Sequence, residues 1–296
     1  YDAQVVERWL DEAAKLTVLV AGEPIIDEYV EVVPAFKTPK DNLVGYRLGA
    51  RREYRGGAGA IADHLSGLCA RGQVTSCPSG PGAVRKRRYL AVPFGEKVFV
   101  VEDEAPFKAD LGLEPPGAIG GYDLVIAADF GHGLFTSLVQ QGFLDGARFL
   151  ALMVQSNSLN WGFNLLTRWP RADYMVADEP EIRLAHSDRT SDIEILGRRE
   201  LDRLRAKLVS VTLGHLGSIV LDGAVVAIPA LATRITDRMG AGDAYLALSA
   251  PLACVGAPPA IVGFVGALAA GIKIGHSGQY PVQQAELRAW IRGVLA

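Results

Sequence analysis

The chain has 296 residues, of which 49% are hydrophobic and 21% are charged, so it can bury a large core without disulfide or metal staples. This length predicts one large domain, with room for a small accessory one. The formal net charge of -3 gives no basic field, which argues against nucleic acid or a membrane surface as the partner.

The first fifteen residues, YDAQVVERWLDEAAK, are amphipathic and charged. A secretory signal peptide needs a basic start and an apolar run, and this segment has neither. The cysteines, Cys69, Cys77 and Cys254, are widely spaced and form neither metal-ligand pairs nor a disulfide framework. We therefore expect a cytoplasmic protein. Because position 1 is not Met, we expect a trimmed chain or a piece of a longer one.

Short apolar runs alternate with helical patterns along most of the chain. Wholly apolar runs are typical of strands covered by helices on both faces. Their alternation with helices predicts an α/β fold with a doubly wound, mostly parallel sheet. We expect strands over 16–21, 123–128, 174–177, 208–212 and 218–221. We expect helices over 60–68, 137–149, 179–185, 193–206 and 243–250.

Two regions, about 28–54 and 84–103, break this rhythm with extended, alternating segments such as YVEVV and KVFVVED. They predict a second, smaller sheet inserted into a single domain over 1–296, where it could serve as a lid. The alternative is an edge extension of the main sheet.

No charged residue occurs from Ala244 to Ile272, a length that could span a bilayer. Pro251, Pro258 and Pro259 divide this stretch into two shorter pieces rich in Ala and Gly. Two buried helices of an α/β core give the same pattern, and we favour that interpretation over a membrane span.

The segment ITDRMGAGDAYLALSAPLA, residues 235–253, predicts a helix that starts at glycines. The first N–H groups of a helix have no internal partner and lie at its positive end. Glycine lets an anion approach those amides closely. Asp243 could then accept a proton from an alcohol while the amides of Gly240, Ala241 and Gly242 stabilise a migrating phosphoryl group. The alternative is that Asp243 simply caps the helix.

No GxxxxGK[ST] phosphate loop and no kinase glycine loop occurs elsewhere. DRMGAGDAYLA resembles the DTxGAGD signature of ribokinase-like (PfkB-type) carbohydrate kinases. Further segments follow in that family's order from about residue 16 to the C-terminus. The resemblance implies an ATP- and Mg²⁺-dependent sugar kinase with Asp243 as catalytic base, and a monovalent cation, K⁺, near Asp237.

On the acceptor side, VAGEPIIDEYV resembles the family's first strand, which implies that Asp27 contacts sugar hydroxyls. RGGAGAIADHLSGL resembles its Gly-Gly motif, which implies that Gly56 and Gly57 let the sugar lie against backbone. Asp129 follows a predicted strand at its carboxyl end, where open α/β sheets bind ligands, so it is a further candidate.

On the nucleotide side, DEPE stands where the family has NxxE, which implies that Asp178 and Glu181 organise Mg²⁺ and water. VTLGHLGSIV resembles the strand and turn that line the nucleotide phosphates, which implies contacts from Thr212, Gly214 and Gly217.

VRKRRYL and DLVIAADFGHGLF resemble segments of the heptose phosphate kinases, often fused to a nucleotidyltransferase domain that this chain does not show. This resemblance implies a phosphorylated sugar acceptor and a homodimer paired through the lid. Alternate residues of a strand share a face, so Lys86 and Arg88 would point together and could bind the acceptor phosphate. Arg85 and Arg87 would then point the other way, into water.

Some positions depart from the family pattern. Ala60 and Ala267 stand where Asn is usual, Leu213 replaces an arginine and His132 replaces a lysine. Two alternatives therefore stay open: a ligand-binding protein of the same fold with weak or lost catalysis, and a kinase for a nucleoside or another small alcohol.

Overall fold

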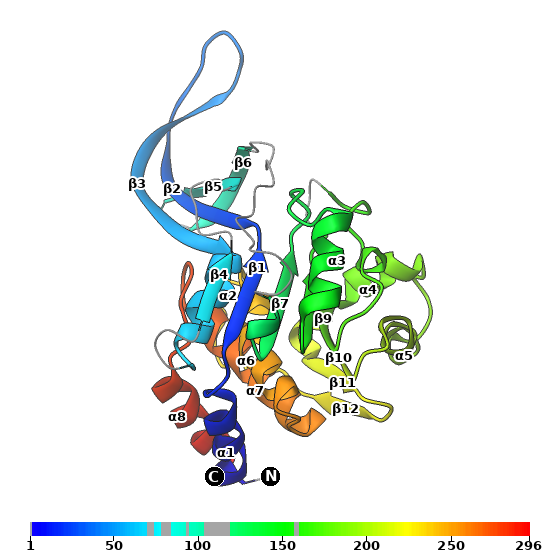
Figure 1. Ribbon diagram of the computed structural model, residues 1–296. Helices are drawn as coiled ribbons and strands as arrows, with labels where there is room; N and C mark the ends of the chain where they lie inside the picture. Colours follow the sequence, from blue (N-terminus) through cyan, green and yellow to red (C-terminus); the bar gives the residue numbers. More distant parts are fainter. Residues whose placement is uncertain (1, 70–73, 78–83, 93–94, 104–118, 157–159) are drawn as a thin grey trace.

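The computed structural model describes residues 2–69, 74–77, 84–92, 95–103, 119–156 and 160–296. These residues form two separate sheets and the helices that cover the larger one (Figure 1).

The larger sheet has eight strands in the order β12-β11-β10-β9-β8-β7-β1-β4. Its ladders are parallel except those of β11, which runs antiparallel to β10 and β12. The mostly parallel sheet expected from the apolar runs is thus confirmed. The strands are β1 (Val18–Gly22), β4 (Val74–Cys77), β7 (Leu124–Asp129), β8 (Leu150–Val154), β9 (Tyr174–Asp178), β10 (Leu208–Thr212), β11 (Ser218–Leu221) and β12 (Val225–Ile228).

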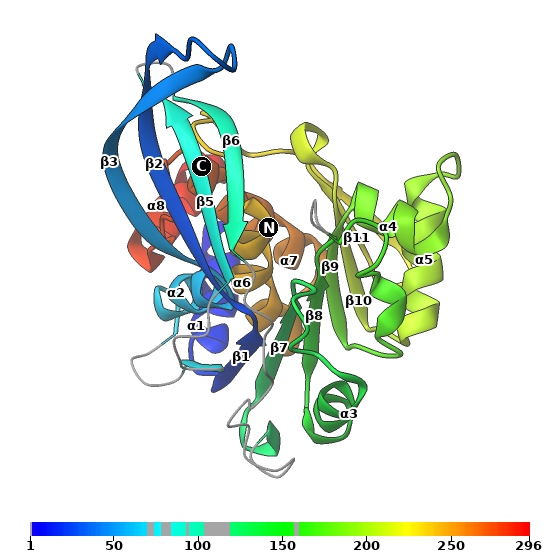
Figure 2. The same ribbon diagram turned by 90° about the horizontal axis from the view of Figure 1, so that it is seen from above.

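Helices cover both faces of this sheet (Figure 2). One face carries α1 (Ala3–Ala13), α2 (Ala58–Ser66), α6 (Ala241–Cys254), α7 (Pro259–Ile274) and α8 (Gln284–Val294). The other face carries α3 (Ser137–Gly146), α4 (Glu179–His186) and α5 (Ile193–Leu204). Successive strand residues point to opposite faces, so both faces of each central strand must be apolar.

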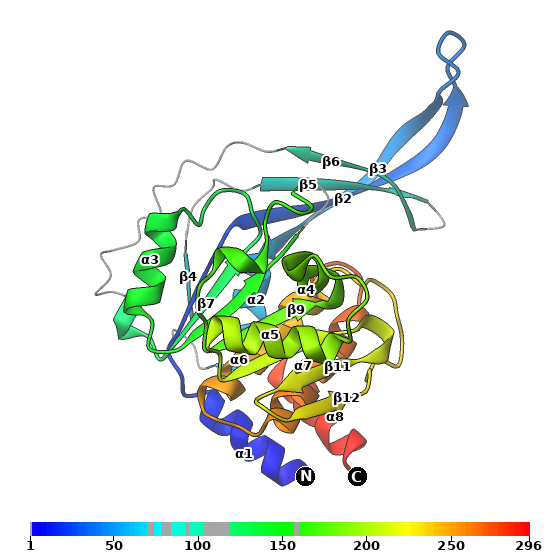
Figure 3. The same cartoon turned by 90° about the vertical axis from the view of Figure 1, so that its right-hand side faces the viewer.

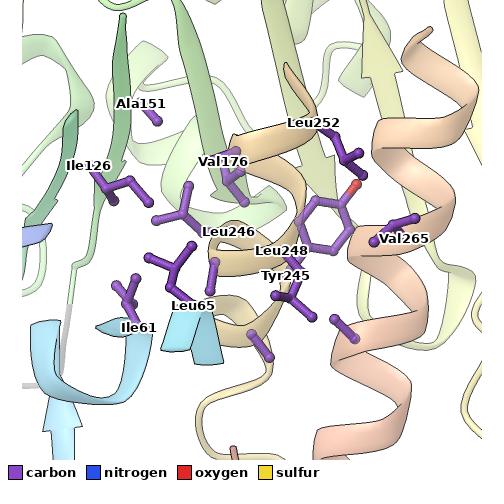
Figure 4. Close-up of a cluster of buried hydrophobic side chains, with 14 of the residues drawn as sticks. Ile61, Leu65, Ile126, Ala151, Val176, Tyr245, Leu246, Leu248, Leu252 and Val265 are labelled. Carbon is purple, nitrogen blue, oxygen red and sulfur yellow. The ribbon is translucent and has the colours of Figure 1, made fainter. Parts of the chain in front are cut away.

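Helix α6 lies at the centre of the first face, between the sheet, α2 and α7 (Figure 4). Leu246 packs toward Ile126 and Val176 of the sheet, while Tyr245 and Leu252 face Val265 of α7 (Figure 4). This packing on all sides fixes the position of the first turn of α6, which carries the predicted catalytic motif.

The smaller sheet has the order β3-β2-β5-β6 and projects beyond the larger one (Figures 1 and 3). Its strands are β2 (Pro24–Lys37), β3 (Val44–Gly57), β5 (Val84–Ala91) and β6 (Glu96–Asp103). The two predicted regions, about 28–54 and 84–103, are therefore confirmed as one sheet of its own. The alternative, an edge extension of the main sheet, is wrong.

The uncharged stretch forms the two buried helices α6 and α7, as favoured above. Pro251, however, lies inside α6 and does not divide it; the chain leaves α6 after Cys254 and re-enters a helix at Pro259. None of the described helices combines the length and hydropathy that a bilayer span requires.

Candidate active site

The predicted phosphate-binding turn is the start of α6. Gly240 is the N-cap, with a left-handed φ of 73°, and a Cβ there would lie 2.8 Å from Gln279 Oε1. The first helical bond runs from Ala244 N to Gly240 O (3.0 Å). Among the described residues, the amides of Gly240, Ala241 and Gly242 have no hydrogen-bond acceptor. These amides are therefore available to an anionic ligand.

Asp243 lies in this first turn and is 8% exposed. It is not the helix cap, because Gly240 holds that position without any side-chain capping bond. Burial and the charge of Asp27 raise the pKa of Asp243, Lys273 opposes both, and the resulting pKa is about 7. A carboxylate with a pKa near 7 suits a general base at neutral pH.

Lys273, near the end of α7, lies beneath this turn and is fully buried. Its Nζ donates to the carbonyl oxygen of Asp237 at 3.5 Å. Burial lowers its pKa, while the charges of Asp237 and Asp243 favour the ammonium form. Sequence reasoning missed this residue. The available signal was that Lys273 is the first charge after the uncharged stretch.

Asp237 joins the turn to the smaller sheet. Its carboxylate accepts hydrogen bonds from Tyr29 Oη of β2 (2.9 Å), Met239 N (3.2 Å) and Gly278 N (3.3 Å). Lys97 Nζ of β6 lies 3.9 Å away. Burial alone would raise the pKa of Asp237, but these donors and the nearby lysines hold it below its usual value.

The predicted acceptor residues come together around Asp27, which is 6% exposed on β2. Arg88 of β5 forms a buried ion pair with its Oδ1, and Gln279 Nε2 donates to its Oδ2 at 3.2 Å.

Gly56 of β3 lies opposite Ile25, two residues before Asp27, and a Cβ on Gly56 would approach Asp27 Oδ2 to 2.4 Å. Gly57 adopts a φ of 56°, which favours glycine. Gly56 is thus required by the close approach of β3 to Asp27, and Gly57 by its positive φ and the nearby Glu23 carbonyl oxygen.

The basic residues of β5 alternate as predicted. Lys86 pairs with Glu102 (2.9 Å), on the side where Arg88 meets Asp27. Arg85 and Arg87 reach Glu28 instead, at 3.0 and 3.1 Å. This second pair stays only partly in water, with side chains 26% and 28% exposed, because the buried Glu28 needs compensating charge.

Asp129, at the end of β7, is 1% exposed, and its carboxylate is surrounded by protein donors. Gly131 N and Asn164 Nδ2 each donate at 3.1 Å, Trp169 Nε1 donates at 3.0 Å, and Arg168 lies 3.5 Å away. Asp129 thus connects the loop after β7 with the segment around Asn164 and Trp169. Its predicted contact with the acceptor stays a prediction.

The predicted nucleotide residues follow β9 and β10, whose register places Asp178 beside Thr212. Asp178 and Glu181 form the capping box of α4, with bonds of 2.8 Å (Glu181 N to Asp178 Oδ1) and 3.0 Å (Asp178 N to Glu181 Oε2). Burial and the charge of Asp178 raise the pKa of Glu181 to about 8, with a smaller contribution from Asp243. The turn after β10 closes through Leu213 N to Gly217 O (2.7 Å).

No family model matches the chain. Among curated proteins, it is 27% identical over 323 residues to the bifunctional protein HldE of Bradyrhizobium diazoefficiens. It is 26% identical over 313 residues to that of Gluconacetobacter diazotrophicus. These matches cover 92% and 93% of this chain but 62% and 64% of the relatives, so the chain spans less than two thirds of their length.

Solved structures resemble the chain over nearly its whole length. Ribokinase from Thermotoga maritima gives a TM-score of 0.72 at 17% identity, covering 94% of this chain and 99% of that one. Phosphofructokinase-2 from Escherichia coli in complex with potassium gives 0.72 at 12%, covering 95% and 99%. Ribokinase from Arabidopsis thaliana, complexed with ribose and ATP, gives 0.70 at 15%, covering 94% and 99%. The chain has the ribokinase fold.

Within the ribokinase fold, the departures noted in the sequence fall at buried or packed positions. Ala60 is buried in α2 and Ala267 in α7, and Leu213 packs against the core beneath α4 and α5. Each therefore contributes packing, and none supplies the polar or charged group expected there.

A hollow of about 200 Å³ adjoins the site through Gln279. Neither Asp27 nor Asp243 belongs to its lining, so it is not the place of the acceptor as the resemblance implies it. The hollow is lined by Glu53, Tyr54, Arg55, Ala60, Asp63, His64, Gln279, Tyr280 and Pro281.

Proposed function

We propose that this chain transfers the terminal phosphoryl group of ATP to a hydroxyl of a sugar or sugar phosphate. The observation that carries the proposal is the first turn of α6. A buried carboxylate, Asp243, with a pKa of about 7 lies beside helix N-terminal amides that have no acceptor among the described residues. A base and an anion-binding turn at one place are the parts that phosphoryl transfer needs.

In this reaction Asp243 takes the proton of the attacking hydroxyl as the new O–P bond forms. The oxygen of the leaving ADP takes the electron pair of the bond that breaks. The amides of Gly240, Ala241 and Gly242 stabilise the charge on the migrating group, and each such donor contributes about 3 kcal/mol. The positive end of the α6 dipole adds to this stabilisation.

The acceptor would lie near Asp27, Gly56 and Gly57, with the smaller sheet as a lid that excludes water. Arg88 and Lys86 lie on the inward side of that sheet and would bind an anionic acceptor. This pair favours a sugar phosphate, of the heptose phosphate class that the sequence resembles, over a neutral sugar or a nucleoside.

ATP would lie along the ends of β9 and β10, near Thr212, Gly214 and Gly217. The carboxylates there fit a cation. Burial and the negative charges of Asp178 and Asp243 raise the pKa of Glu181, and a bound cation would offset that negative charge. No three His, Cys, Asp or Glu side chains of the described ranges form a ready metal site. Mg²⁺ would therefore be held chiefly by phosphates, with Asp178 and Glu181 positioning it through water, and would neutralise phosphate charge.

The relatives named bifunctional protein HldE and the ribokinases of the same fold support a sugar kinase, and a cytoplasmic location is part of the proposal. A homodimer through the smaller sheet is part of the proposal. Large apolar side chains there are exposed, among them Phe36 (57%), Leu48 (74%) and Val100 (53%).

The test is an ATP-consumption assay with a panel of sugars and sugar phosphates, with products identified by mass spectrometry. Asp243→Asn should lower kcat by about 10²–10⁴ because the general base is lost. In the unaltered protein, kcat/KM should fall below about pH 7, as protons bind to Asp243.

The matched control is Asp222→Asn, an exposed carboxylate in the turn between β11 and β12, which should keep normal turnover. Near-normal turnover in Asp243→Asn would contradict the assigned mechanism. Tight binding of nucleotide and sugar by calorimetry, with no product from any acceptor, would favour the ligand-binding alternative.

A further inference from the structure

Lys273 carries a positive charge in the middle of the site, although nothing in the proposed transfer uses it. Its side chain is fully buried at the end of α7. The charges of three carboxylates act on it, those of Asp237, Asp243 and Asp27. A buried ammonium is costly unless such partners compensate it.

The ammonium lies where the sequence resemblance implies a monovalent cation. That cation was expected near Asp237, and Lys273 Nζ faces the Asp237 carbonyl oxygen at 3.5 Å. The Asp237 carboxylate oxygens already accept from Tyr29 Oη, Met239 N and Gly278 N. The oxygens of Asp237 are thus engaged by protein donors, and a second cation beside the ammonium would be repelled. K⁺ does not fit here.

We propose that the Lys273 ammonium is the built-in cation of the phosphate-binding turn, so that the site works without K⁺. Lys273 is a positioning residue in this proposal, because it acts through Asp237, Gly240 and Asp243. The inference rests on the proposed kinase function for its catalytic part only.

The contacts show how Lys273 would hold the turn. Its Cε would lie 3.4 Å from a Cβ built on Gly240, so its stem lies directly against the N-cap of α6. Next to it, the carbonyl of Ile274 accepts from Thr236 N (2.7 Å) and Asp237 N (3.1 Å). The end of α7 therefore fixes the segment that leads into Gly240, and the Lys273 ammonium contacts that segment at the Asp237 carbonyl oxygen.

The same charge acts on the base. Burial and the charge of Asp27 favour protonated Asp243, whereas Lys273 favours the carboxylate. Lys97, from the smaller sheet, opposes the ammonium, and Lys273 in turn lowers the pKa of the buried His64. Removing the ammonium should therefore raise the pKa of Asp243 and leave less carboxylate at neutral pH.

The first experiment compares KCl, NH₄Cl, NaCl and tetramethylammonium chloride at equal ionic strength, using thermal unfolding and kinase assays. The unaltered protein should have the same melting temperature and turnover in all four salts. Lys273→Ala, which leaves space at Asp237, should be stabilised by K⁺ or NH₄⁺ by about 2–4 °C relative to tetramethylammonium. Its lowered turnover should recover in part with the same ions.

The second experiment uses Lys273→Met, which keeps most of the stem but removes the charge. The acid limb of its kcat/KM–pH profile should move upward by about 1 pH unit, because an opposite charge near Asp243 is lost. A purely structural lysine would lower the melting temperature without moving this limb. Lys207→Met, an exposed lysine paired with Asp173, is the control and should leave both unchanged.

Two results would overturn the inference: K⁺ dependence of the unaltered protein, in stability or in turnover, or Lys273 variants with an unmoved acid limb and no response to K⁺. The unfolding measurements need no substrate. If no acceptor is phosphorylated, they still decide whether Lys273 replaces a cation, while the kinase proposal fails separately.

Discussion

The helix pair α6–α7 and the smaller sheet both border the site, but different interactions stabilise them: apolar packing in the helix pair and ion pairs in the sheet. The pair contains two charged residues, Asp243 and Lys273, in an otherwise apolar and polar-neutral sequence packed on all sides (Figure 4). In the smaller sheet, by contrast, charged side chains hold one another. Glu28 alone lies within 3.1 Å of Arg51, Arg85 and Arg87.

This difference teaches which part fixes geometry and which part can adjust. Close packing holds the first turn of α6 in one place, as a base and an anion-binding turn require. Ion pairs at a partly exposed sheet are weaker and exchange partners more easily. Tyr29, which donates to Asp237, links the two parts. We therefore expect substitutions where the smaller sheet meets the helices to lower activity strongly.

Where the smaller sheet meets the helices, the largest effect should come from Gly56→Ala, at the end of β3 just before α2. The new Cβ would lie 2.4 Å from Asp27 Oδ2, so the Asp27 carboxylate must turn away from Arg88 and Gln279. Such a displacement costs about 10²-fold in kcat/KM. Steady-state kinetics measure it, with Gly142→Ala in α3 as control because no atom lies near a Cβ there. Equal kinetics in both variants would show that Asp27 has no role in turnover.

A second effect should appear in stability, on the side of the helix pair. The pKa of Asp243 is about 7 in the folded chain and 3.8 in its ordinary state. Between pH 3.8 and 7, Asp243 keeps its proton in the folded state and loses it in the unfolded state, so the free energy of unfolding falls as the pH rises. Above pH 7 the full loss of stability remains. Asp243→Asn should therefore stabilise the protein by about 4 kcal/mol at pH 8 and little at pH 4.

Chemical denaturation at both pH values measures this difference, again beside Asp222→Asn. A helix cap would give the opposite sign, because loss of a cap destabilises by about 1 kcal/mol. If Asp243→Asn were less stable than the unaltered protein at pH 8, Asp243 would be a helix cap and not a strained buried base.

The smallest effect should come from the smaller sheet. Lys86→Met removes a charge from its inward side and should raise KM for phosphorylated sugars about tenfold, since one charged contact contributes about 1.5 kcal/mol. KM for neutral sugars should not change. Arg47→Met, on the exposed part of β3, is the control. An unchanged KM for sugar phosphates would reject Lys86 as a phosphate contact.

Several local features could be predicted from the sequence because neighbouring residues decide them. The strands 208–212 and 218–221 lie where expected, and the GAGD segment starts a helix. Strand β8 (Leu150–Val154) was missed, since its LALMV sequence continues the apolar pattern of the preceding predicted helix. Pro251 was expected to break a helix, but tertiary packing keeps α6 continuous around it.

The sequence by itself determined the alternation of the main sheet, the existence of a second sheet and the glycine-lined helix start with its carboxylate, because each depends on residues close together in the chain. Only the tertiary structure decided what surrounds that carboxylate. Lys273 reaches the turn from the end of α7, Gln279 reaches it from the segment that follows α7, and Arg88 reaches Asp27 from another strand. Burial and the charges of distant residues set the pKa values of Asp243 and Lys273. Neither can be read from the residues that neighbour them in the sequence.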